Sequence, residues 1–332
     1  MLRFGFCFGE GVSLINSTWF EPIGPVCTTL SKSHAAVFVA LCIIWGSTWL
    51  VIKVGLDYFP PFLFAGARFA VASLFLLCLF PFLHAKFPRD AYSWGIMALL
   101  GVLQIALTYG LLFWGEQYTS SGVAAVLSAT FPFFVIFGSA LIKIESITRR
   151  KLGGIVVAFI GVGLMFWRPL LPGQGSEGMS LLGGLAIVGS AASTGVGTVI
   201  VKQCSSRIHP ATNTLVQSTV GAAALFFVGL ATERYGMFAG LSVNALAAVL
   251  YLGVMGSALA YVCWYWLISE TTATTGSLIL LITPVIAVLL GWLVLQEELG
   301  SVAAVGTILI LSGVYVTLKD ETAKGHSNAR RS

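Results

Sequence analysis

Long apolar stretches alternate with short polar or charged stretches along most of the chain. Each apolar stretch is close to the ~20 residues that a helix needs to cross about 30 Å of hydrocarbon. The stretches are too long and too uniformly apolar for barrel strands. The pattern therefore predicts an all-α integral membrane protein with ten transmembrane helices, at residues 35–56, 62–83, 91–115, 120–142, 151–167, 180–201, 211–230, 243–268, 273–295 and 301–318.

The second half of the chain repeats the first. At an offset of 152 residues, "LGVLQIALTYGLLFWGEQYT" falls on "LGVMGSALAYVCWYWLISET", which aligns Tyr109 with Tyr261. The same offset aligns Pro132 with Pro284, and an offset of 149 aligns Arg68 with Gln217. Five spans per copy is an odd number, so the second copy enters the membrane inverted. Two inverted five-helix repeats are typical of secondary transporters, whose substrate site lies near the midplane between the repeats.

Composition and charge support a membrane protein and narrow its chemistry. Of the 332 residues, 57% are hydrophobic and 9% charged, whereas soluble domains carry about 25% charged residues. No basic face lies outside the spans, so nucleic acid is not an expected partner. The cysteines and histidines show no metal spacing, and no G-x-x-x-x-G-K-[ST] motif is present. We therefore expect no metal, no cofactor and no ATP-driven pumping by this chain.

Lysine and arginine are distributed unequally between the two sides of the predicted spans. If the N-terminus is cytoplasmic, the outer segments hold only Lys53, Arg168 and Arg234, and nearly all other basic residues fall inside. The positive-inside rule thus predicts cytoplasmic N and C termini in a plasma (inner) membrane. The expected domains are an N-terminal cytoplasmic extension or mis-assigned start (1–34), the first repeat (35–167), an external linker (168–179), the second repeat (180–318) and a cytoplasmic tail (319–332).

Several stretches resemble one transporter family. "IIWGSTWLVIK" is similar to the start of an EamA domain, and "FPPFLFAGARFAVA" resembles its second span. "SSGVAAVLSATFPFFVIFGSALIKIESITRRKLGGIVVAFIGVGLMF" and, in the second copy, "ATTGSLILLITPVIAVLLGWLVLQEELGSVAAVGTILILSGVYV" resemble its closing helix pair. The resemblance covers about 35–318. It implies the drug/metabolite transporter superfamily, whose members have ten helices in two inverted EamA repeats and are often exporters of amino acids or other metabolites.

The expected function is secondary transport, most simply export of small metabolites such as amino acids or organic acids by alternating access. Uptake or facilitated passage of another metabolite class is the alternative. An intramembrane enzyme would need paired catalytic groups at membrane depth, which the spans lack, so we expect no enzyme. A non-transporting receptor is the other remote alternative. The expected partners are a small metabolite and the lipid bilayer.

Polar residues and prolines inside the spans are the candidates for the substrate cavity. The alternative for each is packing, because small hydroxyls let helices approach closely and neighbouring helices tolerate a proline kink. The candidates are Ser47, Thr48, Arg68, Tyr109, Pro132, Ser193, Thr194, Thr198, Gln217, Tyr261 and Pro284. A second set, a stripe of small residues, predicts helix packing, either within the chain or in a homodimer: Gly154, Ala158, Gly161, Gly306 and Gly313.

The charged residues in and near the spans lead to one expectation about the role of Arg68 and another about energy coupling. Arg68 lies one or two turns into the second span, where it either binds carbonyls near Pro60 and Pro61, pairs with Asp57, or receives a substrate carboxylate. All thirteen acids fall in loops, in tails or near span ends. We therefore expect no coupling through a buried carboxylate, but facilitated diffusion or coupling through a titrating substrate group.

Overall fold

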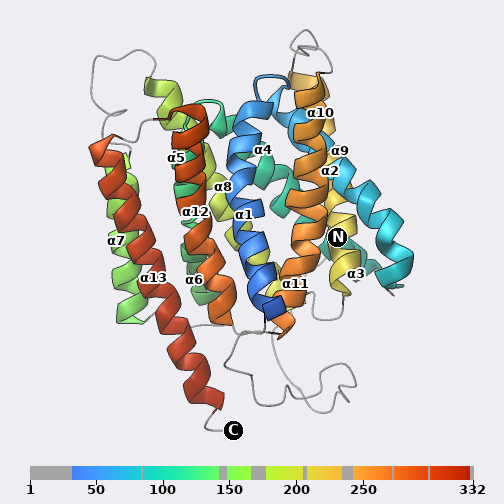
Figure 1. Cartoon of the computed structure of the whole chain (residues 1–332). Coiled ribbons are helices and arrows are strands. Elements are labelled where there is room, and N and C mark those ends of the chain that lie inside the picture. The colour runs from blue at the N-terminus through green and yellow to red at the C-terminus, as the bar shows by residue number, and fades with distance from the viewer. Residues whose placement is uncertain are drawn as a thin grey trace, which may run out of the picture.

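The protein is a bundle of helices that run roughly along one common direction (Figure 1). The computed structural model describes residues 32–83, 85–141, 148–165, 177–204, 208–233, 242–270, 273–297 and 300–329, and these contain helices and no strands. The first half contains α1 (Lys32–Gly55), α2 (Pro61–Leu79), η1 (Phe80–Leu83), α3 (Ala91–Leu100), η2 (Gly101–Leu107), α4 (Thr108–Glu116), α5 (Ser121–Ser128), α6 (Phe131–Leu141) and α7 (Arg149–Met165). The second half contains α8 (Glu177–Cys204), α9 (Pro210–Thr232), α10 (Val243–Leu250), η4 (Tyr251–Leu259), α11 (Ala260–Glu270), α12 (Ala273–Leu295) and α13 (Ser301–Ala329).

Seven helical runs among the described residues are long and apolar enough to cross a membrane. They are Ser33–Gly55, Pro61–Leu83, Ala91–Glu116, Ser121–Gly138, Met179–Ile200, Ala211–Thr232 and Val243–Trp264. Three shorter apolar helices lie within α7, α12 and α13, at Leu152–Leu164, Ile282–Leu295 and Ala304–Val316. These segments confirm the all-helical membrane class.

Local sequence explains where several helices begin. Pro61 and Pro210 are the first residues of α2 and α9, where a missing N–H costs nothing and the fixed φ suits a helix. The Asp90 carboxylate accepts a hydrogen bond from the Ser93 N–H at 2.8 Å and so caps α3.

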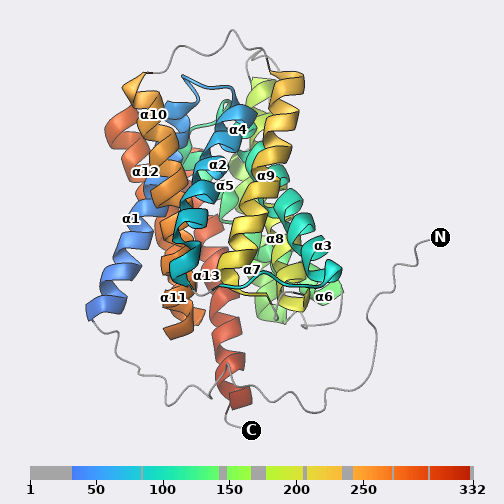
Figure 2. The same ribbon diagram turned by 90° about the vertical axis from the view of Figure 1, so that its right-hand side faces the viewer.

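Helices of one half pack mainly against helices of the other half. α2 packs against its repeat counterpart α9, as Figure 2 shows, and α7 packs against α13. α1 packs against α12, while its counterpart α8 packs against α5 and α6. Each half is therefore held mainly by the other, and residues between α2, α4, η4 and α11 lie at the boundary between them.

Both halves contain a π-helix at the same place in the repeat. η2 covers Gly101–Leu107 and η4 covers Tyr251–Leu259, and the 152-residue offset lays one on the other. A Cβ at Gly101 would meet the carbonyl oxygen of Gln217 at 3.0 Å, and a Cβ at Gly253 would meet that of Arg68 at 2.9 Å. The π-helices thus bring their backbones against the two aligned polar residues, and π-helical turns often mark functional sites.

The predicted fourth and ninth spans differ in continuity. The fourth is interrupted at Ala129 and Thr130, so that Pro132 lies in the first turn of α6, where its missing N–H leaves no helical bond unmade. α12, by contrast, is continuous, and Pro284 lies inside it. The sequence placed both prolines mid-span by symmetry; the structure breaks the helix at one and not at the other.

The small-residue stripe is a seam within the chain. A Cβ at Gly161 of α7 would meet the Gly306 carbonyl oxygen of α13 at 2.6 Å, and a Cβ at Gly313 would meet the Gly154 carbonyl and the Ala158 side chain. Figure 1 shows α7 and α13 side by side. Backbones can approach this closely only where side chains are small. The stripe therefore packs against helices of its own chain.

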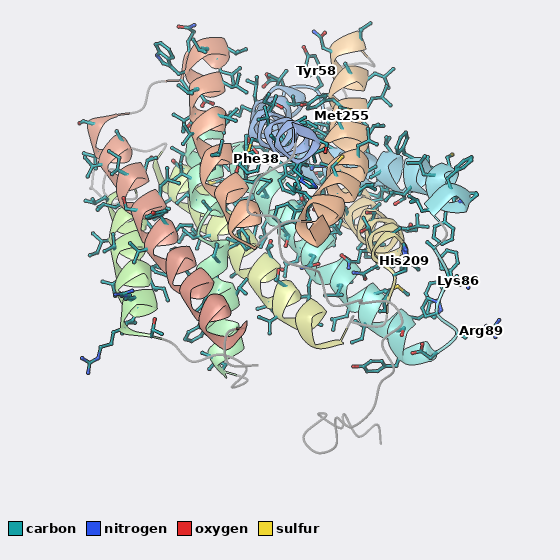
Figure 3. The ribbon with its side chains drawn as sticks, turned by 60° about the horizontal axis from the view of Figure 1, so that its bottom comes forward. Phe38, Tyr58, Lys86, Arg89, His209 and Met255 are labelled. Atoms are coloured by element: carbon teal, nitrogen blue, oxygen red, sulfur yellow. The ribbon has the colours of Figure 1, made fainter. Side chains whose placement is uncertain are left out.

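One end of the bundle gathers the start of α1 and the end of α13, in both views (Figures 1 and 2). Figure 3, seen from that end, shows Lys86 and Arg89 in the segment before α3, near His209 at the start of α9. The Thr212 hydroxyl donates a hydrogen bond to the Lys86 carbonyl at 3.0 Å, which ties this segment to α9. Basic residues thus occur at the end where the sequence predicts the cytoplasm.

Candidate functional site

Arg68 is buried in the bundle and bonds to the other half of the chain. Its side chain is 3% exposed. Nε donates to the Ser257 hydroxyl at 2.9 Å, and Nη2 donates to the Gly256 carbonyl at 3.5 Å. Both acceptors lie on the π-helix η4. The suggested partners near Pro60 and Asp57 are therefore replaced by residues from the second repeat, which no sequence pattern indicated.

Aromatic rings surround the guanidinium. Its Cζ atom lies 4.8 Å from the Tyr109 ring centroid, 5.2 Å from that of Phe69 and 6.0 Å from that of Phe113. Contacts of this length between a cation and a ring face are attractive, and more so where water is excluded. The three rings, the Ser257 hydroxyl and the Gly256 carbonyl together stabilise the charge at membrane depth.

The two repeat-related tyrosines meet at this boundary. The hydroxyl oxygens of Tyr109 and Tyr261 are 3.2 Å apart. Trp45 packs edge-on against Tyr261, with ring centroids 6.2 Å apart, and its Nε1 donates to the Gly256 carbonyl at 3.3 Å. The Gly256 carbonyl thus accepts from both Trp45 and Arg68, so one polar cluster joins α1, α2, α4, η4 and α11.

Hydroxyls on α1 lie beside this cluster. The Ser47 and Tyr251 hydroxyls are 2.6 Å apart, which links α1 to the start of η4. Thr48 is buried and donates to the carbonyl of Trp45 in its own helix at 2.7 Å. Ser47 therefore makes a contact between the halves, whereas the Thr48 hydroxyl is satisfied locally.

The α8 hydroxyls lie against the other π-helix, at a distinct place. Ser193 donates to the Leu103 carbonyl at 2.8 Å, and the Thr194 and Thr108 hydroxyls are 3.2 Å apart. Thr198 donates to the Thr194 carbonyl and accepts from the Gln104 amide at 3.4 Å. These contacts link α8 to η2 and α4 and form a second polar cluster in the bundle.

Gln217 and the two prolines belong to other helices than the Arg68 cluster. Gln217 is 7% exposed on α9, where its carbonyl faces η2. Pro132 and Pro284 belong to α6 and α12, on the side of the bundle where α12 packs against α1 and α6 against α8. The structure therefore brings together Arg68, Tyr109 and Tyr261, with Ser47 and Thr48 against η4. The other candidates lie around η2, on α6 and on α12.

Two acidic residues at span ends cap helices of the opposite half. Glu297, after α12, accepts from the Ser121 N–H at 2.8 Å and from its hydroxyl at 2.9 Å. Glu233, after α9, accepts from the N–H groups of Phe62 and Leu63 at 2.7 and 3.0 Å. Burial raises the pKa of the Glu233 carboxyl above 4.5, and these N–H donors partly oppose that rise. Such capping is an ordinary role of an acidic side chain at the start of a helix.

Glu116 differs from these two acids. It is the last residue of α4 and is 0% exposed, and neither carboxylate oxygen has a hydrogen-bond partner among the described residues. Lys53 lies beside it, but its ammonium donates to the carbonyls of Glu116 at 2.7 Å and Thr119 at 2.6 Å. Glu116 lies at a span end, as the sequence placed it, but its side chain is fully buried. Its apolar neighbours in "LLFWGEQY" were the available signal.

The chain is similar to one protein family, to curated transporters and to a solved structure. The model of the EamA-like transporter family matches twice, at residues 33–167 and 181–319. The uncharacterized inner membrane transporter YedA of Escherichia coli is 32% identical over 291 residues, covering 84% of this chain and 89% of YedA. The uncharacterized transporter YoaV of Bacillus subtilis is 28% identical, covering 84% and 94%. A solved crystal structure shares the fold at a TM-score of 0.59 and 17% identity, covering 86% of this chain and 96% of its own.

Proposed function

Because the chain belongs to the EamA-like transporter family and is a multi-pass membrane protein, we propose that it exports small carboxylate-bearing metabolites, such as amino acids or organic acids. The observation that carries the substrate class is Arg68, a buried cation held between the halves by Ser257 and Gly256. Its two hydrogen bonds use Nε and one hydrogen of Nη2, which leaves the Nη1 donors and the second Nη2 hydrogen for a two-bond fork on a ligand carboxylate. Export follows the family resemblance.

The proposed mechanism is alternating access by two inverted five-helix repeats. Helix contacts that exchange between the halves, the paired π-helices and the Tyr109–Tyr261 contact support a pseudo-two-fold relation. The proposed spans number ten: the three shorter apolar helices are counted with the seven long ones. A substrate at the boundary would then be exposed to either side as one repeat rocks against the other.

The test is a flux assay with the purified protein in liposomes, using a panel of radiolabelled amino acids, organic acids and cationic drugs, with and without an imposed pH gradient. We expect flux of carboxylate compounds and none of permanently cationic ones, because a guanidinium at the site repels cations. Flux of cations alone would overturn the substrate class, and liposomes that transport nothing on the panel would count against transport. Preloaded and externally added substrate distinguish export from uptake.

Both termini are proposed to be cytoplasmic. We expect a single cysteine introduced as Gly175→Cys, with the native cysteines replaced, to react with an impermeant maleimide added outside the cell, because residue 175 falls in the outer linker. A cysteine introduced as Arg89→Cys is the matched control and should stay unlabelled until the membrane is permeabilised. Labelling in the reverse order would invert the proposed topology.

The prolines are expected to affect rate rather than folding. Pro284 removes one backbone bond inside the continuous helix α12, so Pro284→Ala restores that bond and stiffens the helix. We expect the Pro132→Ala, Pro284→Ala double variant to slow transport severalfold at unchanged thermal stability. The single Pro132→Ala variant should cause the smaller part of this slowing, since Pro132 lies in a first helical turn, where no helical bond is lost. Wild-type rates in the double variant would assign both prolines to packing alone.

A further inference from the structure

Glu116 is a buried acidic group that the proposed substrate site does not use. Its side chain has no exposed surface, and within the part of the chain that the structure describes both oxygens lack hydrogen-bond partners. Buried polar groups are otherwise bonded in the great majority of cases, and an ionised carboxylate held without donors carries a large solvation cost. The group therefore requires a physical account.

The neighbouring charges have partners of their own. The groups whose charges act on Glu116 are Lys53 of α1, Glu297 after α12, and Arg68 of α2. The Lys53 ammonium binds the carbonyls that end α4, Glu297 caps α5 at Ser121, and Arg68 bonds to η4. None of these hydrogen bonds reaches the Glu116 carboxylate, so its charge is opposed only at a distance.

Helix α4 connects this acid with the Arg68 cluster. Tyr109, Phe113 and Glu116 recur at spacings of four and three and therefore share one helix face. The rings of Tyr109 and Phe113 contact the Arg68 guanidinium. A change of charge at Glu116 thus occurs on the face that meets both the buried arginine and, through Tyr109, the second repeat at Tyr261.

We propose that Glu116 reversibly binds the proton that couples this transporter to a pH gradient. Protonation adds no heavy atom, so it needs no ligand cavity, and it converts the carboxylate into a neutral acid that is far cheaper to bury. One Oε–H bond forms with a proton taken from water on one side of the membrane and breaks when the proton is released to water on the other. In the ionised state, the carboxylate attracts Lys53 and Arg68 and so favours a different arrangement of α1, α2 and α4. This inference rests on the proposed transport function and replaces the expectation that no acid carries a proton.

Glu116→Gln keeps the shape and removes the charge. In proteoliposomes, we expect accumulation driven by the pH gradient to fall by about tenfold or more, while substrate exchange without a gradient stays within about twofold of wild type. Asp57→Asn is the matched control, because Asp57 is an exposed acid shortly after α1; it should leave both rates unchanged. Folding is checked by gel filtration and thermal unfolding in detergent.

A second measurement does not depend on the variant. Substrate added to wild-type proteoliposomes that contain a pH-sensitive dye should move protons, and Glu116→Asp, which keeps an acid, should retain this movement. Wild-type transport without proton movement, or full gradient-driven accumulation by Glu116→Gln, would overturn the coupling role and leave the transport function standing. Absence of all flux from wild type would instead count against the proposed function.

Discussion

Replacing Arg68 by glutamine is expected to lower transport of carboxylate-bearing metabolites by about 10- to 100-fold, because a hydrogen bond to a charged group contributes about 1.5–3 kcal/mol. The variant places the residue of the second repeat, Gln217, at the equivalent position in the first. Arg68→Lys should keep the charge and lose the planar fork, so we expect an intermediate loss of about tenfold. Rates are measured in proteoliposomes with one carboxylate substrate.

The fold should tolerate this change. Glutamine can still donate to the Ser257 hydroxyl or the Gly256 carbonyl, and removing a buried charge lowers the desolvation cost of the site. Arg89→Gln is the matched control, since Arg89 is an exposed arginine in the segment before α3. A well-folded Arg68→Gln protein that transports carboxylates at the wild-type rate would assign Arg68 to structure alone.

Gly161→Leu is expected to destabilise the protein by about 3 kcal/mol, at the upper end of the usual cost of overpacking. The new Cβ would meet the Gly306 carbonyl oxygen at 2.6 Å and the Ile310 nitrogen at 2.9 Å. Both are backbone atoms of α13, so α7 and α13 have to separate. Thermal unfolding in detergent micelles measures the loss.

Gly163→Leu is the control on the same helix. Nothing lies within 4 Å of a Cβ at Gly163, which is exposed, and leucine has the better helix propensity by up to about 1 kcal/mol. We therefore expect unchanged or slightly raised stability. Equal losses at the two glycines would contradict a seam between α7 and α13, and a change of oligomeric state in Gly161→Leu alone would indicate a dimer face.

The sequence by itself determined the class of protein and the residues worth testing. Apolar runs of membrane length form helices, since lipid offers no hydrogen-bond partners and a helix satisfies its backbone groups internally. The internal repeat alone aligned Tyr109 with Tyr261. In the structure, their hydroxyl oxygens lie 3.2 Å apart. An arginine inside a span was conspicuous because an unneeded buried charge is costly.

Partners and burial were decided only by the tertiary structure. Arg68 bonds to Ser257, 189 residues away, and no periodicity along one helix reports which neighbour its face meets. Glu116 is near a span end in sequence, yet packing from other helices removes all its exposed surface. The same holds for Pro132 and Pro284: identical residues at aligned positions lie beside a helix break in one repeat and within a continuous helix in the other. Local sequence sets which structures a segment can adopt, whereas contacts between distant segments select one of them and set the environment of each charge.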